Sequence, residues 1–154
     1  MDHGLWREYL KLLEGLGRTM DQLAEIERKK TEAVSSSNLN AVEDCMTREQ
    51  ALSLSLRGFE QRRTAMLSKL GIPDTSLSQL EQYSPEGLEL ETRRAVEDLR
   101  RQYEMFQSAA SVARNTLECN LRVIERMRAS QEKAAEAAPP AERFSGITGR
   151  CRRR

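Results

Sequence analysis

Hydrophobic residues recur in steps of three and four along most of the chain, which is the spacing of an amphipathic helix. Three segments follow this pattern, over residues 5–34, 39–70 and 85–131. The one run with a period of two, residues 51–56, lies inside the second segment and has no β-branched residue, so strands are not expected. Because the connections are short, neighbouring helices should be antiparallel. The pattern predicts an all-α fold: an elongated antiparallel three-helix bundle, coiled-coil-like in its packing.

Turn-forming residues mark the ends of these segments. The stretch SSSNLN at 35–40 offers several N-caps for the second helix. Gly71 suits the left-handed position that closes a helix. Residues 74–83 are expected to form a short helical turn. Ser84 followed by Pro85 then predicts the N-cap and the first residue of the third helix.

Two glycines interrupt the first helix. Gly15 and Gly17 each cost about 1 kcal/mol of helix stability relative to alanine. A tolerated weak point or a close approach between helices would explain them, and a functional hinge is the alternative.

The apolar stripe stops near residue 131, and the remaining residues are rich in alanine, proline and glycine. We therefore expect a helical domain over 1–131 and a flexible, disordered tail over 132–154. Residues 133–154 contain six basic and two acidic side chains, while the formal net charge of the whole chain is only +1. The tail is thus basic and the bundle slightly acidic.

The composition excludes several classes of protein. The three cysteines are far apart and lack CxxC spacing, so neither a disulfide framework nor a zinc site is expected. The N-terminus does not resemble a signal peptide, and no apolar run reaches the ~18 residues of a membrane span. These features favour a cytoplasmic protein.

Candidate chemistry is sparse. The only histidine, His3, lies at the N-terminus, so the serine and cysteine side chains have no credible general base. We expect no catalytic site, no metal site and no cofactor. The RCRRR ending would bind phosphates only nonspecifically, and no nucleic-acid partner is expected because the bundle is slightly acidic.

The third helix is about 15 residues longer than the second on these boundaries. Its C-terminal part therefore has an apolar stripe that lacks one partner, formed by Leu117, Leu121, Ile124 and Met127. Such a stripe forms a groove for an incoming amphipathic helix. The alternative is that the N-terminal half of the first helix covers the stripe with Leu5, Trp6, Tyr9 and Leu13.

Two asparagines occur within this part of the helix, although asparagine is a poor helix former. Asn120 lies in the apolar seam, where a polar residue fixes register and partner number at some cost in stability. Asn115 is expected to face solvent.

Three stretches together resemble the FlgN-like flagellar export chaperones. They are LKLLEGLGRTMDQLAEIERKK (10–30), EQRRTAMLSKLGIP (60–73) and ARNTLECNLRVIERM (113–127). The first is similar to the family's Leu-rich opening helix, the second to the Leu-Gly corner that ends its second helix, and the third to its last helix. The resemblance covers about residues 5–130.

The resemblance implies a cytoplasmic chaperone of the flagellar type III secretion system. Such chaperones bind the C-terminal helical segments of the hook–filament junction proteins FlgK and FlgL, prevent their premature assembly and pass them to the export apparatus. The client-binding role then falls on Leu117, Leu121, Ile124 and Met127. In the tail, the family's Tyr-Gly-like element is replaced here by RFSGITGR, with Phe144.

A second hypothesis from the residues alone is a structural module. A coiled-coil or spectrin-like scaffold, as a monomer or homodimer, would have helices that saturate one another and no groove for a client. Binding of an exogenous amphipathic helix distinguishes the two hypotheses.

Overall fold

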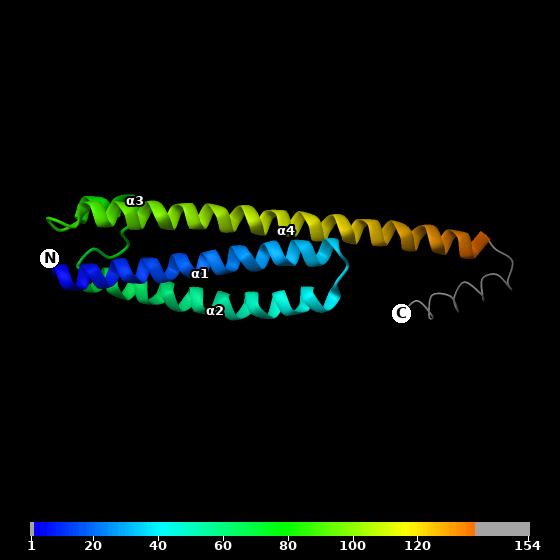
Figure 1. The fold of residues 1–154 in the computed structure, drawn as a ribbon, viewed down its shortest axis with the longest axis horizontal. Helices are drawn as coiled ribbons and strands as arrows, with labels where there is room; N and C mark the ends of the chain where they lie inside the picture. Colours follow the sequence, from blue (N-terminus) through cyan, green and yellow to red (C-terminus); the bar gives the residue numbers. More distant parts are fainter. Residues whose placement is uncertain (1, 138–154) are drawn as a thin grey trace. The chain divides into compact units, whose positions relative to one another are not determined.

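The computed structural model describes residues 2–137, and all regular secondary structure in this range is helical (Figure 1). The all-α helical bundle predicted from the sequence is confirmed. The elements in chain order are α1 (His3–Ser35), α2 (Leu39–Lys69), α3 (Leu77–Leu80), the 3-10 helix η1 (Glu81–Tyr83) and α4 (Glu89–Ala137).

The chain divides into two compact units. The first, Met1–Arg114, contains α1, α2, α3, η1 and the N-terminal part of α4. The second, Asn115–Arg154, is described as far as Ala137 and consists there of the C-terminal part of α4. Phe144 and the rest of the predicted tail beyond residue 137 lie outside the described residues.

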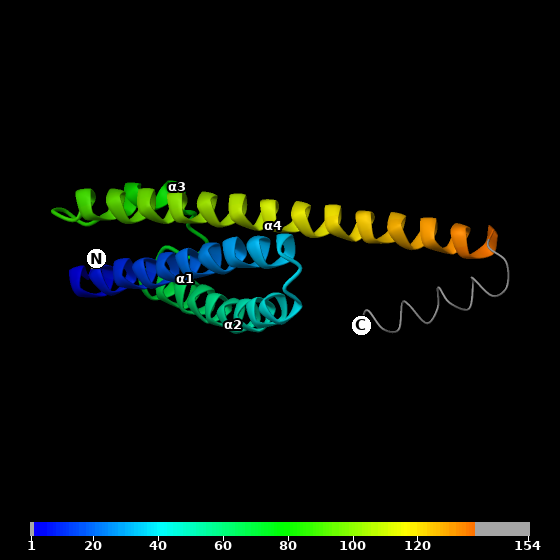
Figure 2. The same ribbon diagram turned by 45° about the vertical axis from the view of Figure 1, so that its right-hand side comes forward.

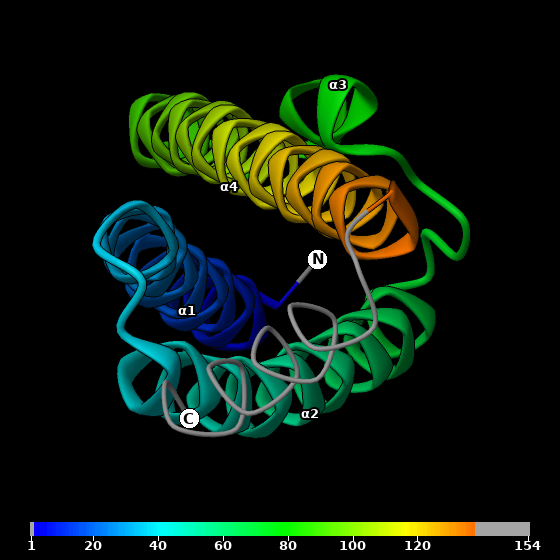
Figure 3. The same cartoon turned by 90° about the vertical axis from the view of Figure 1, so that its right-hand side faces the viewer.

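In the first unit, α1 lies between α2 and the beginning of α4 (Figures 1, 2 and 3). Lys30 of α1 contacts Glu49 of α2, so these two helices run antiparallel. The α1 and α4 helices run parallel, because contacts join Trp6 to Thr92 and Asp21 to Gln102. The core of this unit is an apolar cluster that includes Trp6, Tyr9, Leu13, Leu16, Leu67, Leu80, Leu88, Val96 and Leu99.

A buried hydrogen bond joins α1 to α4 within this core. The indole Nε1–H of Trp6 donates to Thr92 Oγ1 at 2.8 Å, and both residues are fully buried. The Thr92 hydroxyl in turn donates to the carbonyl of Leu88 at 2.8 Å. An unpaired buried indole N–H is costly, so this contact fixes the register between the two helices.

The predicted caps explain two of the helix ends. The side chain of Asn38, within the SSSNLN stretch, accepts a hydrogen bond from the Ala41 backbone N–H at 3.2 Å and begins α2. Gly71 adopts a φ of 77°, as predicted for the residue that closes α2. The Ile72 N–H bonds to the Leu67 carbonyl at 3.0 Å, which completes a Schellman motif, and both residues belong to the buried apolar cluster.

The predicted start of the last helix is wrong. Ser84 is not its N-cap and Pro85 is not its first residue, because α4 begins at Glu89. The Leu88 N–H bonds to the Pro85 carbonyl at 3.0 Å, and Gly87 has a φ of 89°, so these residues form a turn. The preceding stretch was predicted correctly as a short helical turn, since α3 and η1 lie within 74–83.

The predicted end of the last helix is also wrong. The α4 helix ends at Ala137 rather than at 131, so residues 132–137 are helical and do not belong to a tail. The apolar stripe does stop near 131, but the alanine, glutamate and lysine residues that follow are strong helix formers and continue the helix without it.

The two glycines of α1 permit close helix contacts. A Cβ at Gly15 would lie 2.8 Å from the Phe59 ring of α2, and a Cβ at Gly17 would overlap the side chain of Gln102 on α4. The α1 helix runs unbroken through both positions. Close approach is therefore the role of these glycines.

Candidate functional site

The described part of the second unit exposes a row of large apolar side chains. Leu117, Leu121, Val123, Ile124 and Met127 are between 40% and 61% exposed. None of the residues from 115 to 137 is buried, whereas α4 buries Thr92, Val96, Leu99 and Ala113 in the first unit. We call these five side chains the α4 stripe. Contiguous exposed apolar surface of this kind marks interaction sites on soluble proteins.

Helix geometry places the members of the stripe near one another. Leu121 and Ile124 follow Leu117 by four and seven residues, which puts the three on one face of the helix. Met127 extends this face by almost one further turn. Val123 was not among the predicted residues, because a single seam was assumed and Val123 lies to one side of it. A prediction that allowed a wider apolar face on this helix would have included Val123.

The alternative in which the first helix covers the stripe is wrong. Trp6, Tyr9 and Leu13 are buried in the core of the first unit, and Leu5 packs against the same cluster. In an up-down-up bundle the first and third helices are parallel, so the N-terminal half of α1 lies beside the N-terminal end of α4. The predicted residues Leu117, Leu121, Ile124 and Met127 are exposed instead.

The two asparagines differ in their surroundings. Asn115 is exposed, as predicted, whereas Asn120 is half-buried. Asn120 lies within the arc of the stripe, and its role in fixing register stays a prediction.

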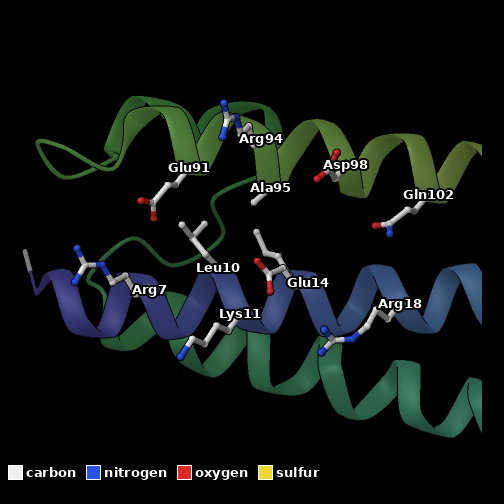
Figure 4. Close-up of a pocket in the computed structure, with 11 residues that line it drawn as sticks. Arg7, Leu10, Lys11, Glu14, Arg18, Glu91, Arg94, Ala95, Asp98 and Gln102 are labelled. Atoms are coloured by element: carbon white, nitrogen blue, oxygen red, sulfur yellow. The ribbon is translucent and has the colours of Figure 1, made fainter.

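A groove of about 600 Å³ lies between α1 and α4 in the first unit (Figure 4). Basic and acidic side chains line both of its walls, with Arg7, Lys11, Arg18 and Glu14 on α1 and Glu91, Asp98 and Arg94 on α4. Its apolar floor belongs to the buried core. It offers charges of both signs and little free apolar surface, so it suits an incoming helix less well than the α4 stripe does.

A smaller hollow of about 440 Å³ lies on α2. Its apolar side chains are Met46 and Leu54, both largely exposed, and polar residues supply the rest of the lining. Two separated apolar residues give a smaller apolar contact than the five of the α4 stripe, so the stripe remains the principal candidate.

A partly buried charge cluster links α1 to α2, with Glu27 buried and Lys30 and Glu49 half-buried. Lys30 Nζ lies 3.2 Å from the Glu27 carboxylate and 3.0 Å from that of Glu49. Burial raises the pKa of Glu27 to about 7, and the neighbouring Glu49 adds to this rise. Burial also tends to raise the pKa of Glu49. Its hydrogen bonds with Glu27 and Lys30 outweigh this effect, so the pKa of Glu49 is lowered overall. The cluster is a proton-dependent link between two helices, and its Glu49 also lines the hollow on α2.

Within residues 2–137, no group of three or more histidine, cysteine or acidic side chains is arranged to hold a metal ion. His3 bonds through Nε2 to the Glu86 backbone carbonyl at 3.1 Å. None of the helices in this range is both long and apolar enough to cross a bilayer. After the groove, the hollow and the charge cluster have been considered, the α4 stripe is the principal candidate for a functional site.

Comparison with known proteins identifies a family. The model of the FlgN protein family matches residues 1–141. No curated protein and no solved structure matches the chain.

Proposed function

Because the chain belongs to the FlgN family of flagellar export chaperones, we propose that it binds the hook–filament junction proteins FlgK and FlgL. In this proposal it is a cytoplasmic chaperone of the flagellar type III export system. It holds the C-terminal helical segments of these clients and so prevents their premature assembly. The export apparatus then receives the client from it.

The observation that supports this function is the α4 stripe. Five large apolar side chains lie about half exposed on one helix, and an amphipathic helix of a client would cover them. Burying the exposed half of these side chains contributes about 4–7 kcal/mol. Association itself costs at least about 4 kcal/mol. The stripe alone therefore gives modest affinity, which suits a client that must be released for export.

The scaffold alternative requires that the helices of the chain saturate one another. Within the first unit α1 meets that requirement, because both α2 and α4 cover it, whereas α2 buries only Cys45 and Leu67. The described part of the second unit does not, because the stripe is exposed. A scaffold would therefore need a second chain to cover the stripe.

Calorimetric titration with C-terminal peptides of FlgK and FlgL from the same organism tests the proposal. A flagellin C-terminal peptide is the control ligand, and Asn115→Asp, on the exposed face of the same helix, is the control variant. We expect micromolar or tighter binding that Leu121→Asp and Ile124→Asp weaken without loss of helicity. If none of the peptides binds and the protein forms a folded oligomer, the chaperone proposal is wrong and the scaffold hypothesis is supported.

A further inference from the structure

The α4 stripe is wider than contact with one helix requires. Successive residues of an α-helix are rotated by about 100°, so Leu121 lies about 40° to one side of Leu117 and Val123 about 120° to the other. The stripe thus spans an arc of about 160°. The seam of a two-stranded coiled coil uses only two positions per heptad and is much narrower. One partner helix would leave part of this arc in water.

The arc has two apolar ridges with a polar residue between them. The first, the Leu ridge, consists of Leu117, Leu121 and Ile124, and the second, the Val–Met ridge, of Val123 and Met127. On the helical wheel Asn120 lies between Ile124 and Met127. Asn120 is half-buried, and all five ridge residues are exposed.

Charged residues flank the two ridges, and one more, the exposed Arg128, lies within the Leu ridge, between Leu117 and Leu121 on the helical wheel. Glu118, Glu125 and Glu132 repeat every seven residues and lie beyond the Leu ridge. The basic residues on the opposite side, beyond the Val–Met ridge, are Arg122, Arg126 and Lys133. All six side chains are exposed.

These six charges lie too far around the helix to meet a single partner centred on the stripe. From the middle of the arc, the glutamates are rotated by about 100–140° and the basic residues by about 140–180°. The glutamates lie about 50–90° from the middle of the Leu ridge, and Arg126 and Lys133 lie about 80–100° from the middle of the Val–Met ridge, close to the charged flanking positions of a coiled coil. Arg122 lies about 120° from the middle of the Val–Met ridge and is not a flanking residue. The width of the stripe fits two helices better than one, and Glu118, Glu125, Arg126 and Lys133 lie where they can flank them.

We propose that the α4 stripe binds two amphipathic helices of one client at the same time. The helix on the Leu ridge presents basic side chains to Glu118 and Glu125, and the helix on the Val–Met ridge presents acidic side chains to Arg126 and Lys133. This proposal rests on the proposed function and specifies the client's chemistry. A second copy of this chain would bring one α4 helix, so it would cover one ridge and leave the other exposed.

The test is titration of the wild-type chain and matched variants with full-length monomeric FlgK, whose helices are then all available. Leu121→Asp alters one ridge, Val123→Asp alters the other, and Asn115→Ala, which adds no charge and lies outside both ridges, is the control. Binding of two helices predicts that each ridge variant weakens binding by roughly tenfold or more, because each places a charge in a buried contact. The control should bind as the wild type does.

Charge reversals give a second readout that leaves the apolar surface intact. Glu125→Lys and Arg126→Glu should each weaken binding at low salt, and both losses should shrink at high salt. Circular dichroism checks that helicity is kept. If Val123→Asp lowers helicity, the near-isosteric Val123→Thr replaces it and should still weaken binding.

The possible outcomes separate this inference from the proposed function. If the wild type binds but only one ridge and one set of charges affect affinity, binding of two helices is refuted while the chaperone function stands. If the wild type does not bind, both are refuted. If sedimentation shows a client-free dimer that Leu121→Asp dissociates and FlgK does not displace, a second copy covers the stripe and the inference is wrong.

Discussion

Replacing Thr92 by valine tests how α1 and α4 are held in register. The substitution keeps the shape of the side chain and removes the hydroxyl that accepts the Trp6 indole N–H, 2.8 Å away. Both residues are fully buried, so water does not replace the lost partner. An unsatisfied buried donor costs about 1–3 kcal/mol.

Little else should contribute to this cost. The Leu88 carbonyl loses the Thr92 hydroxyl but still accepts the Thr92 backbone N–H at 3.0 Å. We therefore expect Thr92→Val to lower the free energy of unfolding by about 1–3 kcal/mol. Urea denaturation measures it, with circular dichroism for all variants and the fluorescence of Trp6, the only tryptophan, as a second probe.

A double-mutant cycle separates the hydrogen bond from effects of packing. In the Trp6→Phe background there is no indole N–H to leave unpaired, so Thr92→Val should be nearly neutral there. If Thr92→Val costs the same in both backgrounds, the hydrogen bond does not fix the register and the argument from burial is wrong.

Three further predictions concern other parts of the chain. Gly15→Ala should destabilise the protein because its Cβ would meet a ring of α2, whereas Gly58→Ala, whose Cβ would meet only the Arg62 side chain at 3.9 Å, should stabilise it by about 1 kcal/mol in chemical denaturation. Because the pKa of Glu27 is raised to about 7 from 4.5, its contribution to stability is full below pH 4.5 and is lost as the pH rises through 7. Glu27→Gln should flatten that part of the stability profile, and the exposed Glu25→Gln should leave it unchanged. Asn120→Leu should raise the melting temperature and broaden association, so an unchanged melting temperature and oligomeric state would refute a role in register.

The sequence was sufficient to predict the helices and most of their ends. Periodicity gave three long helices, and local chemistry at Asn38 and Gly71 gave two of their caps, because both depend on residues close in the chain. The start of α4 was missed because Ser84 and Pro85 have the residue types of a helix start. The left-handed conformation at Gly87 delays the helix to Glu89.

Contacts between distant residues were harder to predict. Nothing in the local sequence pairs Trp6 with Thr92, or buries the charged Glu27 beside Lys30, because both depend on helix register. Four members of the exposed stripe were named from the excess length of the last helix, and Val123 was missed because one seam was assumed.

Hydrogen exchange with and without FlgK tests most directly whether the client covers the α4 stripe. We predict slower amide exchange over residues 115–131 when the client is bound, with little change in α1 and α2. Slower exchange over residues 7–18 and 91–102, which line the groove of Figure 4, with none over 115–131, would contradict the account and place the client between α1 and α4.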